Sequence, residues 1–535
     1  MSAATTSPAE VIASGRAVLG IELGSTRIKA CLVDADEPTR VLATGSHAWE
    51  NRYRDGNWTY ALADVWAGLQ TAYAALVADV QRRHGVVVET LAAAGVSAMM
   101  HGYLPFDAEG ELLVPFRTWR NTSTERAAGV LSELLGTNIP LRWSIAHLYQ
   151  AVLDEEDHIP DVASFTTLAG YVHEKLTGRR VLGIGDASGM FPIDVATHDY
   201  DAVMAAKFDR LVAERAPGLR LRSLLPDVLV AGEAAGELTS EGAALLDPSG
   251  TLRPGVLFCP PEGDAGTGMV ATNSVAPRTG NVSAGTSIFA MVVLEGPLKR
   301  AHDELDLVTT PAGDLVAMVH CNNGASELAA WVGLFERFAA IAGGTLDADE
   351  VFEALFLESL DGAPDAGGLL AYNHLAGEPI AGLPEGRPLF VRTPDSRLTL
   401  ANFMRAQLYG VFGTLALGMR VLANEGVELD RMYAHGGVFR TAGIAQRFLA
   451  GALDAPVAVA ATASEGGAWG IAVLAAFAAD GAGDPIDTYL TDRVFAQTGF
   501  DSIDPDPEDV PGFAAYLTRY RTGLTIEHAA IAAMP

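Results

Sequence analysis

Two short segments far apart in the chain share one pattern, and this internal echo constrains the fold more than any other feature. Residues 22–33, ELGSTRIKACLV, match residues 283–294, SAGTSIFAMVVL, in the order of a β-rich run, a glycine with two hydroxyl residues, and a second β-rich run. We interpret each copy as a β-hairpin whose turn is Gly-Ser-Thr or Gly-Thr-Ser. Because the separation far exceeds the period of a solenoid repeat, the echo predicts two similar domains.

The size and composition of the chain agree with two domains. Its 535 residues exceed a typical single domain, and 49% of them are hydrophobic, which is ordinary for a protein with buried cores. No low-complexity linker divides the sequence, so the echo sets the boundary. We predict a disordered tail at residues 1–15, an N-terminal domain at 16–274 and a C-terminal domain at 275–535.

Hydrophobic patterning predicts the α/β class. Short β-rich runs occupy residues 17–23, 86–91 and 93–100. Between them, residues 62–85 carry apolar side chains every three or four positions, which is typical of a helix packed on a sheet. Alternation of this kind indicates strands covered by helices.

Charge and cysteine content exclude several classes of partner. The net charge of -30 leaves no broad basic surface for nucleic acid or an anionic membrane. The three cysteines, Cys31, Cys259 and Cys321, fit neither a disulfide framework nor a paired-cysteine metal site. The N-terminus lacks a signal-peptide pattern, and the apolar run at 470–479 is too short to span a membrane. We expect a soluble cytoplasmic protein with buried thiols and no nucleic-acid or membrane partner.

The two turns are suited to binding phosphate. Gly24 and Gly285 let the backbone approach a ligand closely, and exposed N–H groups in such turns form a small anion-binding nest. The hydroxyls of Ser25, Thr26 and Thr286 add hydrogen-bond donors. An ordinary polar turn is the alternative for a single copy. Two copies at equivalent places favour phosphate binding.

Charged residues flank the first turn. Beside a phosphate, Lys29 can neutralise a transferring phosphoryl group, whereas on an isolated outer strand it is a solvated charge. A carboxylate as close to polyphosphate as Glu22 would be repulsive unless a divalent cation such as Mg²⁺ lay between them. The alternative for Glu22 is an acid at a strand end that faces solvent. The chain contains no P-loop pattern that would supply phosphate binding in another way.

Several motifs, in order along the chain, resemble the FGGY family of carbohydrate kinases, the family of xylulokinase, ribulokinase and glycerol kinase. The first hairpin is similar to the family motif acid-x-Gly-Thr-x-x-x-Lys/Arg, with Glu22, Gly24, Thr26 and Lys29 in the corresponding places. Residues 97–121 resemble the xylulokinase-type sugar stretch, and residues 176–194 resemble the Leu-Thr-Gly segment. Residues 262–269 resemble the Gly-Asp segment with the catalytic base, residues 283–287 the second phosphate motif, and residues 436–457 the adenosine motif.

The resemblance implies two actin-like or ribonuclease H-like domains with an active-site cleft between them. It also implies transfer of the γ-phosphate of ATP, with Mg²⁺, to a hydroxyl of a small ketose, a pentulose such as xylulose or ribulose. Asp264 would align and deprotonate that hydroxyl and would contact the metal together with Glu22. By its local sequence alone, Asp264 is equally an ordinary turn residue between glycines.

The same resemblance places nucleotide contacts in both halves of the chain. The implied phosphate and adenosine contacts are Gly24, Ser25, Thr26, Lys29, Gly285, Thr286, Gly436, Gly437, Arg440 and Thr441. Paired glycines leave a flat surface on which adenine can lie. Arg440 is equally compatible with a surface position at the start of a helix. We expect residues 468–477 to form a buried helix behind the adenine site.

The implied sugar contacts are Met100, His101, Gly102, Trp119, Arg120, Asn121 and Asp264. Structural roles in the core are the alternative for His101 and Trp119. The segment WRNTST departs from the usual Trp-Asn-Asp-x-Arg, so that Arg120 and Asn121 stand near the position of a missing acid. A cation there extends the candidate acceptors to another polyol, a branched sugar or a sugar acid, with Arg117 and His147 as further candidate ligands.

Glu22 is a second departure, because most members of the family carry Asp at that position. An actin-like ATPase, which couples hydrolysis to a partner, would share both hairpins but would not need the His101 and Trp119 segments or the Gly-Asp base. A catalytically inactive sugar sensor would bind its ligand without turnover. Retention of Glu22, Lys29 and Asp264 favours the kinase. The motifs do not define the sugar, the hydroxyl or the oligomeric state, for which a homodimer is one candidate.

Overall fold

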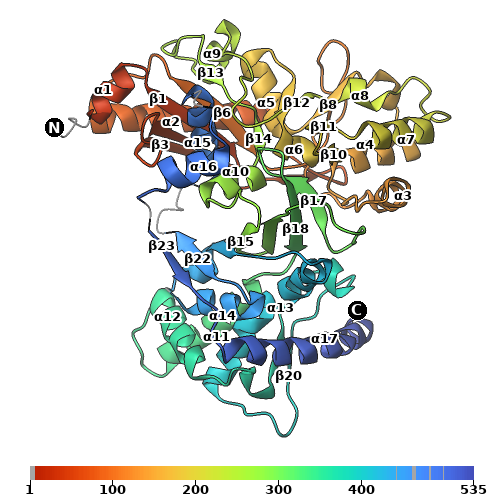
Figure 1. Ribbon diagram of the computed structural model, residues 1–535, viewed down its shortest axis with the longest axis vertical. Helices are drawn as coiled ribbons and strands as arrows, with labels where there is room; N and C mark the ends of the chain where they lie inside the picture. Colours follow the sequence, from red (N-terminus) through yellow and green to blue (C-terminus); the bar gives the residue numbers. More distant parts are fainter. Residues whose placement is uncertain (1–5, 442, 461–465, 481–482, 498, 535) are drawn as a thin grey trace. The chain divides into compact units, whose positions relative to one another are not determined.

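The structure is a computed structural model that describes residues 6–441, 443–460, 466–480, 483–497 and 499–534 (Figure 1). The chain divides into two compact units. The first unit consists of Met1–Val275, Leu307–Val316 and Ala463–Thr498. The second consists of Ala276–Asp306, Ala317–Thr462 and Gly499–Pro535.

The units differ from the two predicted domains, because they are interleaved along the sequence. Residues 307–316 and 463–498 return to the first unit from within the range assigned to the C-terminal domain. The physical reason for the second return is packing: helix α15 (Gly466–Asp480) lies against strands at the start of the chain.

The prediction of a disordered tail at residues 1–15 is wrong for residues 6–15, which the structure describes. Helix α1 (Pro8–Ala13) begins after Ser7, whose hydroxyl caps the backbone N–H of Glu10, while the Glu10 carboxylate accepts from the Ser7 N–H. Val11 and Ile12 are buried in the core of the first unit. The helix is therefore capped at its start and packed along one side.

The first unit contains a sheet with the strand order β13-β6-β1-β2-β3, and β14 also pairs with β6. The bounds are β1 (Ala17–Leu23), β2 (Arg27–Asp34), β3 (Val41–Ala48), β6 (Ala93–Ala98), β13 (Leu257–Phe258) and β14 (Glu262–Gly263). β1 and β2 are antiparallel with Ala17 opposite Asp34, whereas β1 and β6 are parallel. The predicted first hairpin is confirmed, and its loop is residues 24–26.

The helices of the first unit cover this sheet. The predicted helix at 62–85 is confirmed as α2 (Leu62–His84), which packs on β2 and β3. The predicted strand at 86–91 is wrong: Val88 and Leu91 are buried, but the segment pairs with no strand in the described chain. The other helices are α3 (Glu125–Leu135), α4 (Ser144–Leu153), α5 (Leu168–Thr177), α6 (Ile184–Ser188), α7 (Ala202–Val212), α8 (Leu221–Leu224), α9 (Ser240–Leu246), α10 (Asp264–Ala271) and α16 (Ile486–Tyr489).

Helix α15 approaches the first sheet very closely because glycine occupies the contact. A Cβ atom on Gly20 of β1 would lie 2.0 Å from the Ala468 carbonyl oxygen. A Cβ on Gly470 would lie 2.2 Å from the Thr267 carbonyl oxygen of α10. Figure 1 shows α15, coloured blue, beside β1 and β6 from the beginning of the chain. A residue larger than glycine at either position would push the helix away.

The second unit repeats the hairpin arrangement in a sheet with the order β17-β18-β16-β15-β21-β22-β23, in which residues 307–309 of β17 and 315–316 of β18 belong to the first unit. The bounds are β15 (Thr279–Ala284), β16 (Ile288–Val293), β17 (Asp306–Thr309), β18 (Leu315–Cys321), β21 (Arg431–His435), β22 (Val457–Ala460) and β23 (Phe500–Ile503). β15 is antiparallel to β16 and parallel to β21, as β1 is to β2 and β6. The second predicted hairpin is therefore confirmed, and the two α/β units share their local topology.

Helices pack around the second sheet: α11 (Ser326–Ile341), α12 (Ala348–Glu358), α13 (Leu400–Glu425), α14 (Ile444–Leu453) and α17 (Asp509–Ala533). In the described part of the chain, α13 alone is long and apolar enough to cross a membrane, and 72% of its most apolar window is buried inside the protein. It is the central helix of this unit's core. The three cysteines are free and buried, as expected.

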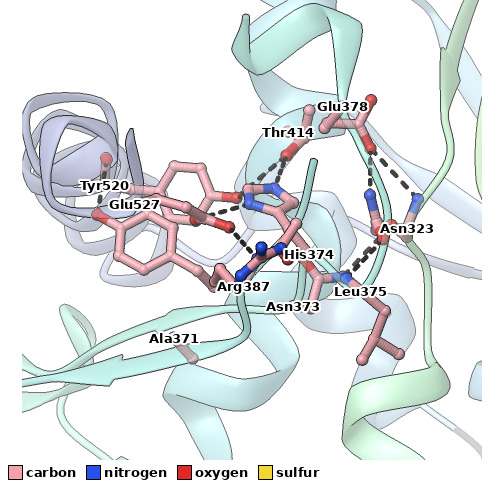
Figure 2. Close-up of polar contacts among 12 residues, drawn as sticks. Asn323, Ala371, Asn373, His374, Leu375, Glu378, Arg387, Thr414, Tyr520 and Glu527 are labelled. Atoms are coloured by element: carbon pink, nitrogen blue, oxygen red, sulfur yellow. Dashed lines mark hydrogen bonds and ion pairs between the residues drawn. The ribbon is translucent and has the colours of Figure 1, made fainter. Parts of the chain in front are cut away.

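A buried polar network ties the helices of the second unit together (Figure 2). His374 follows β19 (Leu370–Tyr372), and its Nδ1 lies 2.8 Å from Glu527 Oε2 of α17. Its Nε2 lies 3.1 Å from both the Thr414 hydroxyl of α13 and the Tyr520 hydroxyl of α17. Both His374 and Glu527 are fully buried, so their polar atoms must be satisfied by groups of the protein. The network fixes α13 and α17 against the segment after β19.

Candidate active site

The chain turns sharply directly after β6, at the predicted sugar segment. His101 and Gly102 have φ angles of 66° and 94°, so both adopt the left-handed backbone region. A Cβ on Gly102 would lie 2.7 Å from the Phe116 ring and 2.9 Å from the Arg117 carbonyl oxygen. Only glycine fits there, whereas His101 is a non-glycine residue in a rare conformation, which is a feature that clusters at functional sites.

Two neighbouring elements hold this turn in place. His101 Nδ1 lies 3.2 Å from the Gly189 carbonyl oxygen, in the loop after α6. The hydroxyl of Ser144, the first residue of α4, donates to the Gly102 carbonyl oxygen at 2.5 Å. Trp143 lies parallel to the His101 ring with a centroid separation of 6.4 Å. His101 is 5% exposed, so it is both structurally held and at the edge of solvent.

Asp264 lies next to this turn. It is the first residue of α10 and follows β14, which runs parallel to β6 with Gly263 opposite Ala98. The Met100 N–H donates to Asp264 Oδ1 at 3.2 Å. Loss of water around the carboxyl raises the pKa of Asp264 to about 6, while the Met100 N–H opposes that rise. The structure thus brings together two motifs that are far apart in the sequence.

Two further carboxyls lie beside Asp264, and no sequence motif pointed to them. Glu262 accepts from the N–H groups of Gly185 and Asp186 at 3.2 and 2.9 Å. Asp186 accepts from the Thr167 hydroxyl at 2.6 Å. Burial raises the pKa of Asp186 to about 7 and that of Glu262 to about 8, and the charge of Asp264 adds to the shift of Asp186. Each occurs in a short Gly-Asp or Glu-Gly segment that reads as a turn, so no local signal identifies them.

The first hairpin presents Glu22 and Lys29 on facing strands. The two residues are opposite each other in the β1–β2 register, and Lys29 Nζ lies 3.8 Å from Glu22 Oε2. Thr26 is exposed at the tip of the loop, and Gly24 and Ser25 are half-buried. This loop, with a carboxylate before it and an ammonium group after it, has the chemistry expected of a phosphate-binding turn.

Aromatic side chains fix the backbone of this loop. The Trp49 indole N–H donates to the Gly24 carbonyl oxygen at 2.7 Å, and the Tyr60 hydroxyl donates to the Ser25 carbonyl oxygen at 2.6 Å. The indole N–H of Trp119 donates to the Ser25 hydroxyl at 3.3 Å. Trp119, which the sequence assigned to the sugar, therefore connects its segment to the phosphate loop.

The start of α15 lies over Glu22. A Cβ on Gly467 would lie 2.6 Å from Glu22 Oε1 and 3.0 Å from the Thr267 hydroxyl. Thr267 is three residues after Asp264 on α10, and its hydroxyl lies 3.0 Å from that of Ser97 on β6. The prediction of a buried helix at 468–477 is confirmed. The helix belongs to the first unit and adjoins Glu22, whereas Gly436 and Gly437 belong to the second unit, so its place behind the adenine site stays a prediction.

Glu22 and Asp264 fit the Mg²⁺ that the family implies. Mg²⁺ takes oxygen ligands and commonly uses one or two carboxylates, with water and substrate phosphates completing its shell. Within the described ranges, no group of three or more His, Cys, Asp or Glu side chains can hold a metal ion. Glu22 and Asp264 would supply two such carboxylates, and water and substrate phosphates would complete the shell.

Arg120 and Asn121 are used by the protein itself. The Arg120 guanidinium lies 3.9 Å from the centre of the Trp58 ring and is exposed. Asn121 Oδ1 accepts from the Trp58 N–H at 2.8 Å, and its Nδ2 donates to the carbonyl oxygens of Trp58 and Thr118 at 2.9 and 3.0 Å. Both amide hydrogens are occupied, so Asn121 braces β5 (Asn57–Thr59), and its assignment as a sugar ligand is corrected to a structural role.

Arg117 and His147 also have partners of their own. Arg117 forms an ion pair with Glu156 and lies over the Tyr103 ring. His147 is buried on α4, and burial together with the Arg117 charge lowers its pKa to about 3, so its ring is neutral. Arg117 is therefore balanced by an acid, whereas Arg120 lies over an aromatic ring and stays a candidate for the anionic group of a sugar acid.

In the second unit, the predicted nucleotide glycines lie together. Gly285 and Thr286 are exposed in the β15–β16 loop, and their carbonyl oxygens accept from the N–H groups of Ala325 and Gly324 at 2.8 and 2.7 Å. Gly436 has a φ angle of 112°, and a Cβ on it would lie 2.2 Å from the Ala284 carbonyl oxygen. The glycine pair that starts at 436 therefore adjoins the second phosphate loop.

The polar residues of the adenosine motif lie further out. Arg440 is exposed, with its guanidinium 3.4 Å from Asp349 and over the Phe352 ring. Thr441 is half-buried, and residue 442 lies outside the described residues. The Gln446 amide donates to the carbonyl oxygens of Val457 and Asp501, which gives it a structural role.

The chain has two α/β units, and each contains a hairpin whose turn consists of glycine and hydroxyl residues. It also has a carboxylate at the start of a helix, next to a sharply turned segment. Together these features define the class of sugar-phosphorylating enzymes with an actin-like or ribonuclease H-like fold. Family models agree with this class. The model of the N-terminal domain of the FGGY family of carbohydrate kinases matches residues 17–251, and that of the C-terminal domain matches residues 280–479. The chain belongs to the FGGY family of carbohydrate kinases, and it is an ATP-dependent phosphotransferase.

Solved structures share the whole fold at low sequence identity. A xyloylose kinase from Brucella ovis is 22% identical with a TM-score of 0.77, over 96% of this chain and 100% of that one. A gluconate kinase from Lactobacillus acidophilus is 16% identical with a TM-score of 0.77, over 95% and 98%. A glycerol kinase from Plasmodium falciparum, solved with ADP, is 13% identical with a TM-score of 0.73, over 96% and 98%. These similarities establish the fold and leave the sugar open.

Proposed function

We propose that the protein transfers the γ-phosphate of ATP to a hydroxyl of a small ketose, a pentulose such as xylulose or ribulose, with Asp264 as the general base. The hydrogen bond from the Met100 N–H to Asp264 supports this proposal most, because it joins a carboxylate to the segment that we assign to the sugar. A general base must lie within hydrogen-bond reach of the proton that it takes.

In this mechanism, the turn at Met100, His101 and Gly102 orients the ketose, and Trp119 forms a wall of its site. Asp264 Oδ1 accepts from the Met100 N–H, so we assign proton uptake from the sugar hydroxyl to Oδ2. Lys29 lowers the cost of charge that develops on the transferring group. Glu22 and Asp264 would hold Mg²⁺, which would screen the charge of the phosphates when bound.

The nucleotide assignments follow the two hairpins. We assign phosphate contacts to the loop at Gly24–Thr26, whose tip is exposed, and to the exposed Gly285 and Thr286, and adenosine contacts to Gly436 and Gly437. Arg440 and Thr441 remain candidate adenosine contacts. A cytoplasmic location, a homodimer and the absence of nucleic-acid and membrane partners remain predictions from the sequence.

Activity should depend on pH through Asp264. A general base must be deprotonated, and the pKa of Asp264 is raised to about 6. We therefore expect kcat/KM for the sugar to fall about tenfold for each pH unit below 6 and to be level above it. Initial rates between pH 5 and 8, at saturating ATP and constant ionic strength, measure this limb. A limb near pH 4 or no acid limb would contradict the assignment.

The sugar is identified by measuring ADP release from ATP, with Mg²⁺, across ketopentoses, ketotetroses, branched sugars, polyols and sugar acids. We expect one or two ketopentoses to stimulate release by about 100-fold or more over a no-sugar control, because a bound hydroxyl replaces water as the acceptor. Stimulation by sugar acids alone would replace the ketose assignment. Equal release without any sugar would instead indicate an ATPase.

A further inference from the structure

The outer edge of the first sheet carries a pocket that has Thr26 and Lys29 of the first hairpin in its wall and extends to residues that the kinase mechanism does not use. It has a volume of about 1000 Å³. It lies along the edge strand β3, between the start of β2 and the last turns of α2. Arg27, Lys29, Arg82 and Arg83 line it, together with Asp79. A volume of this size accommodates a metabolite.

The charge of this pocket is opposite to that of the protein. Four of its lining residues are cations and one is an acid, whereas the chain as a whole carries a net charge of -30. Arg27 is exposed, and within the described ranges it makes no ion pair. Such a concentration of cations in an acidic protein attracts and binds anions that the remaining surface repels.

Asp79 holds the two helix arginines at the pocket. It is buried on α2, and its Oδ2 accepts from the Thr44 N–H of β3 at 3.1 Å. Arg82 forms an ion pair with Asp79 Oδ1, and Arg83 Nη1 lies 3.5 Å from Oδ2. One carboxylate thus orients two guanidinium groups, so a net positive charge remains. Guanidinium groups held in this way bind phosphate with two hydrogen bonds each.

The edge of β3 adds neutral donors to the same wall. The His84 ring covers the strand upstream, with Nε2 2.8 Å from the Leu42 carbonyl oxygen. Thr44 and Ser46 of β3, whose side chains carry hydroxyl groups, also line the pocket. A cluster of cations with hydroxyl groups between them matches a ligand that carries several charged oxygens.

We propose that this edge pocket, lined by Arg27, Lys29, Arg82, Arg83, Thr44 and Ser46, binds a small molecule that bears phosphate groups, separately from the ATP consumed in catalysis. Lys29 belongs both to the pocket wall and to the Glu22 pair of the first hairpin, at 3.8 Å. An anion in the pocket competes with Glu22 for Lys29. Occupancy is therefore coupled to the first phosphate loop, and the coupling is reciprocal.

Calorimetric titration of the full chain with inorganic pyrophosphate tests this proposal. The titration is done without divalent cations and at low ionic strength, because salt screens exposed charges. We expect saturable binding that the double substitution Arg82→Gln/Arg83→Gln weakens about tenfold or more. The matched control is Arg215→Gln/Arg253→Gln, which removes two other exposed arginines that also pair with acids on the first unit. It should stay within about twofold of the unsubstituted protein.

Two further measurements keep the test decisive. Arg27→Gln removes a cation that supports no ion pair, so it should weaken pyrophosphate about threefold without altering the melting temperature. ADP titration of each variant in the absence of pyrophosphate should give equal affinities. Pyrophosphate binding that is absent, or unchanged in the Arg82/Arg83 and Arg27 variants, would overturn the proposal. A parallel loss of ADP affinity would also overturn it, because the arginines would then serve the nucleotide site.

Discussion

Replacement of Asp264 by asparagine is expected to lower kcat about 1000-fold while ADP affinity stays within about twofold. Asparagine keeps the size of the side chain and an oxygen that can accept from the Met100 N–H, so the turn after β6 should be preserved. It cannot take a proton, and the barrier therefore rises at the transfer step. Sugar-dependent ADP release and ADP calorimetry on the same preparation measure the two quantities.

Asp186→Asn is the matched control for this substitution. Asp186 is a neighbouring buried carboxyl, and its pKa of about 7 keeps much of it protonated at neutral pH. It bonds to Thr167 and is assigned no part in the mechanism, so its replacement should lower kcat far less than that of Asp264. Ordinary turnover in Asp264→Asn would show that the base is another residue.

Replacement of Lys29 by methionine should lower kcat about 100-fold and change the KM for the sugar by less than about threefold. Lys29 faces Glu22 across the first hairpin and is assigned to the charge of the transferring group, which develops only in the transition state. Methionine retains most of the length of the side chain. Steady-state rates with varied sugar at saturating ATP separate the two parameters.

Lys175→Met provides the control for loss of one positive charge. Lys175 is exposed on α5, lies near the Tyr171 ring and is assigned no part in the mechanism. Its replacement should leave kcat within about twofold. An unchanged kcat in Lys29→Met would show that Lys29 is an ordinary surface charge. A large rise in the KM for the sugar alone would show that Lys29 contributes to sugar binding.

The hairpins were predictable because their signal is local. A strand, a three-residue turn of glycine and hydroxyls, and a second strand occupy about a dozen consecutive residues, and β1–β2 and β15–β16 pair as that pattern predicts. The run at 86–91 has the same β-branched composition, yet no strand lies beside it. Strand propensity measures how well side chains fit a sheet, and it contains no information about whether a partner is present.

The site itself was predictable in part. Asp264 and the turn at His101 come together because β14 runs parallel to β6, and the motifs anticipated both members of that pair. Glu262 and Asp186 were missed, because their importance arises only from burial beside Asp264. Asn121 shows the opposite error, in which a motif residue has a structural role. Its amide suits a sugar hydroxyl, but its Nδ2 donates to the carbonyl oxygens of Trp58 and Thr118.

The place of α15 could not be read from the sequence at all. Its contacts with β1 and α10 are made by Gly20, Gly467 and Gly470, where the absence of a side chain is the relevant property. A glycine signals close approach only when the partner backbone is known. The helix was therefore predicted from its apolar residues and assigned to the wrong unit.

This packing of α15 has a consequence for biosynthesis. Strands β1 and β6 are made early, but the helix that covers them ends at Asp480, so the ribosome must synthesise most of the chain before the first unit can close. Until then, the apolar face around Gly20 and Gly95 stays open to aggregation and to chaperones. Synthesis past Asp480, rather than completion of the first half of the chain, is therefore the event that permits this unit to reach its final stability.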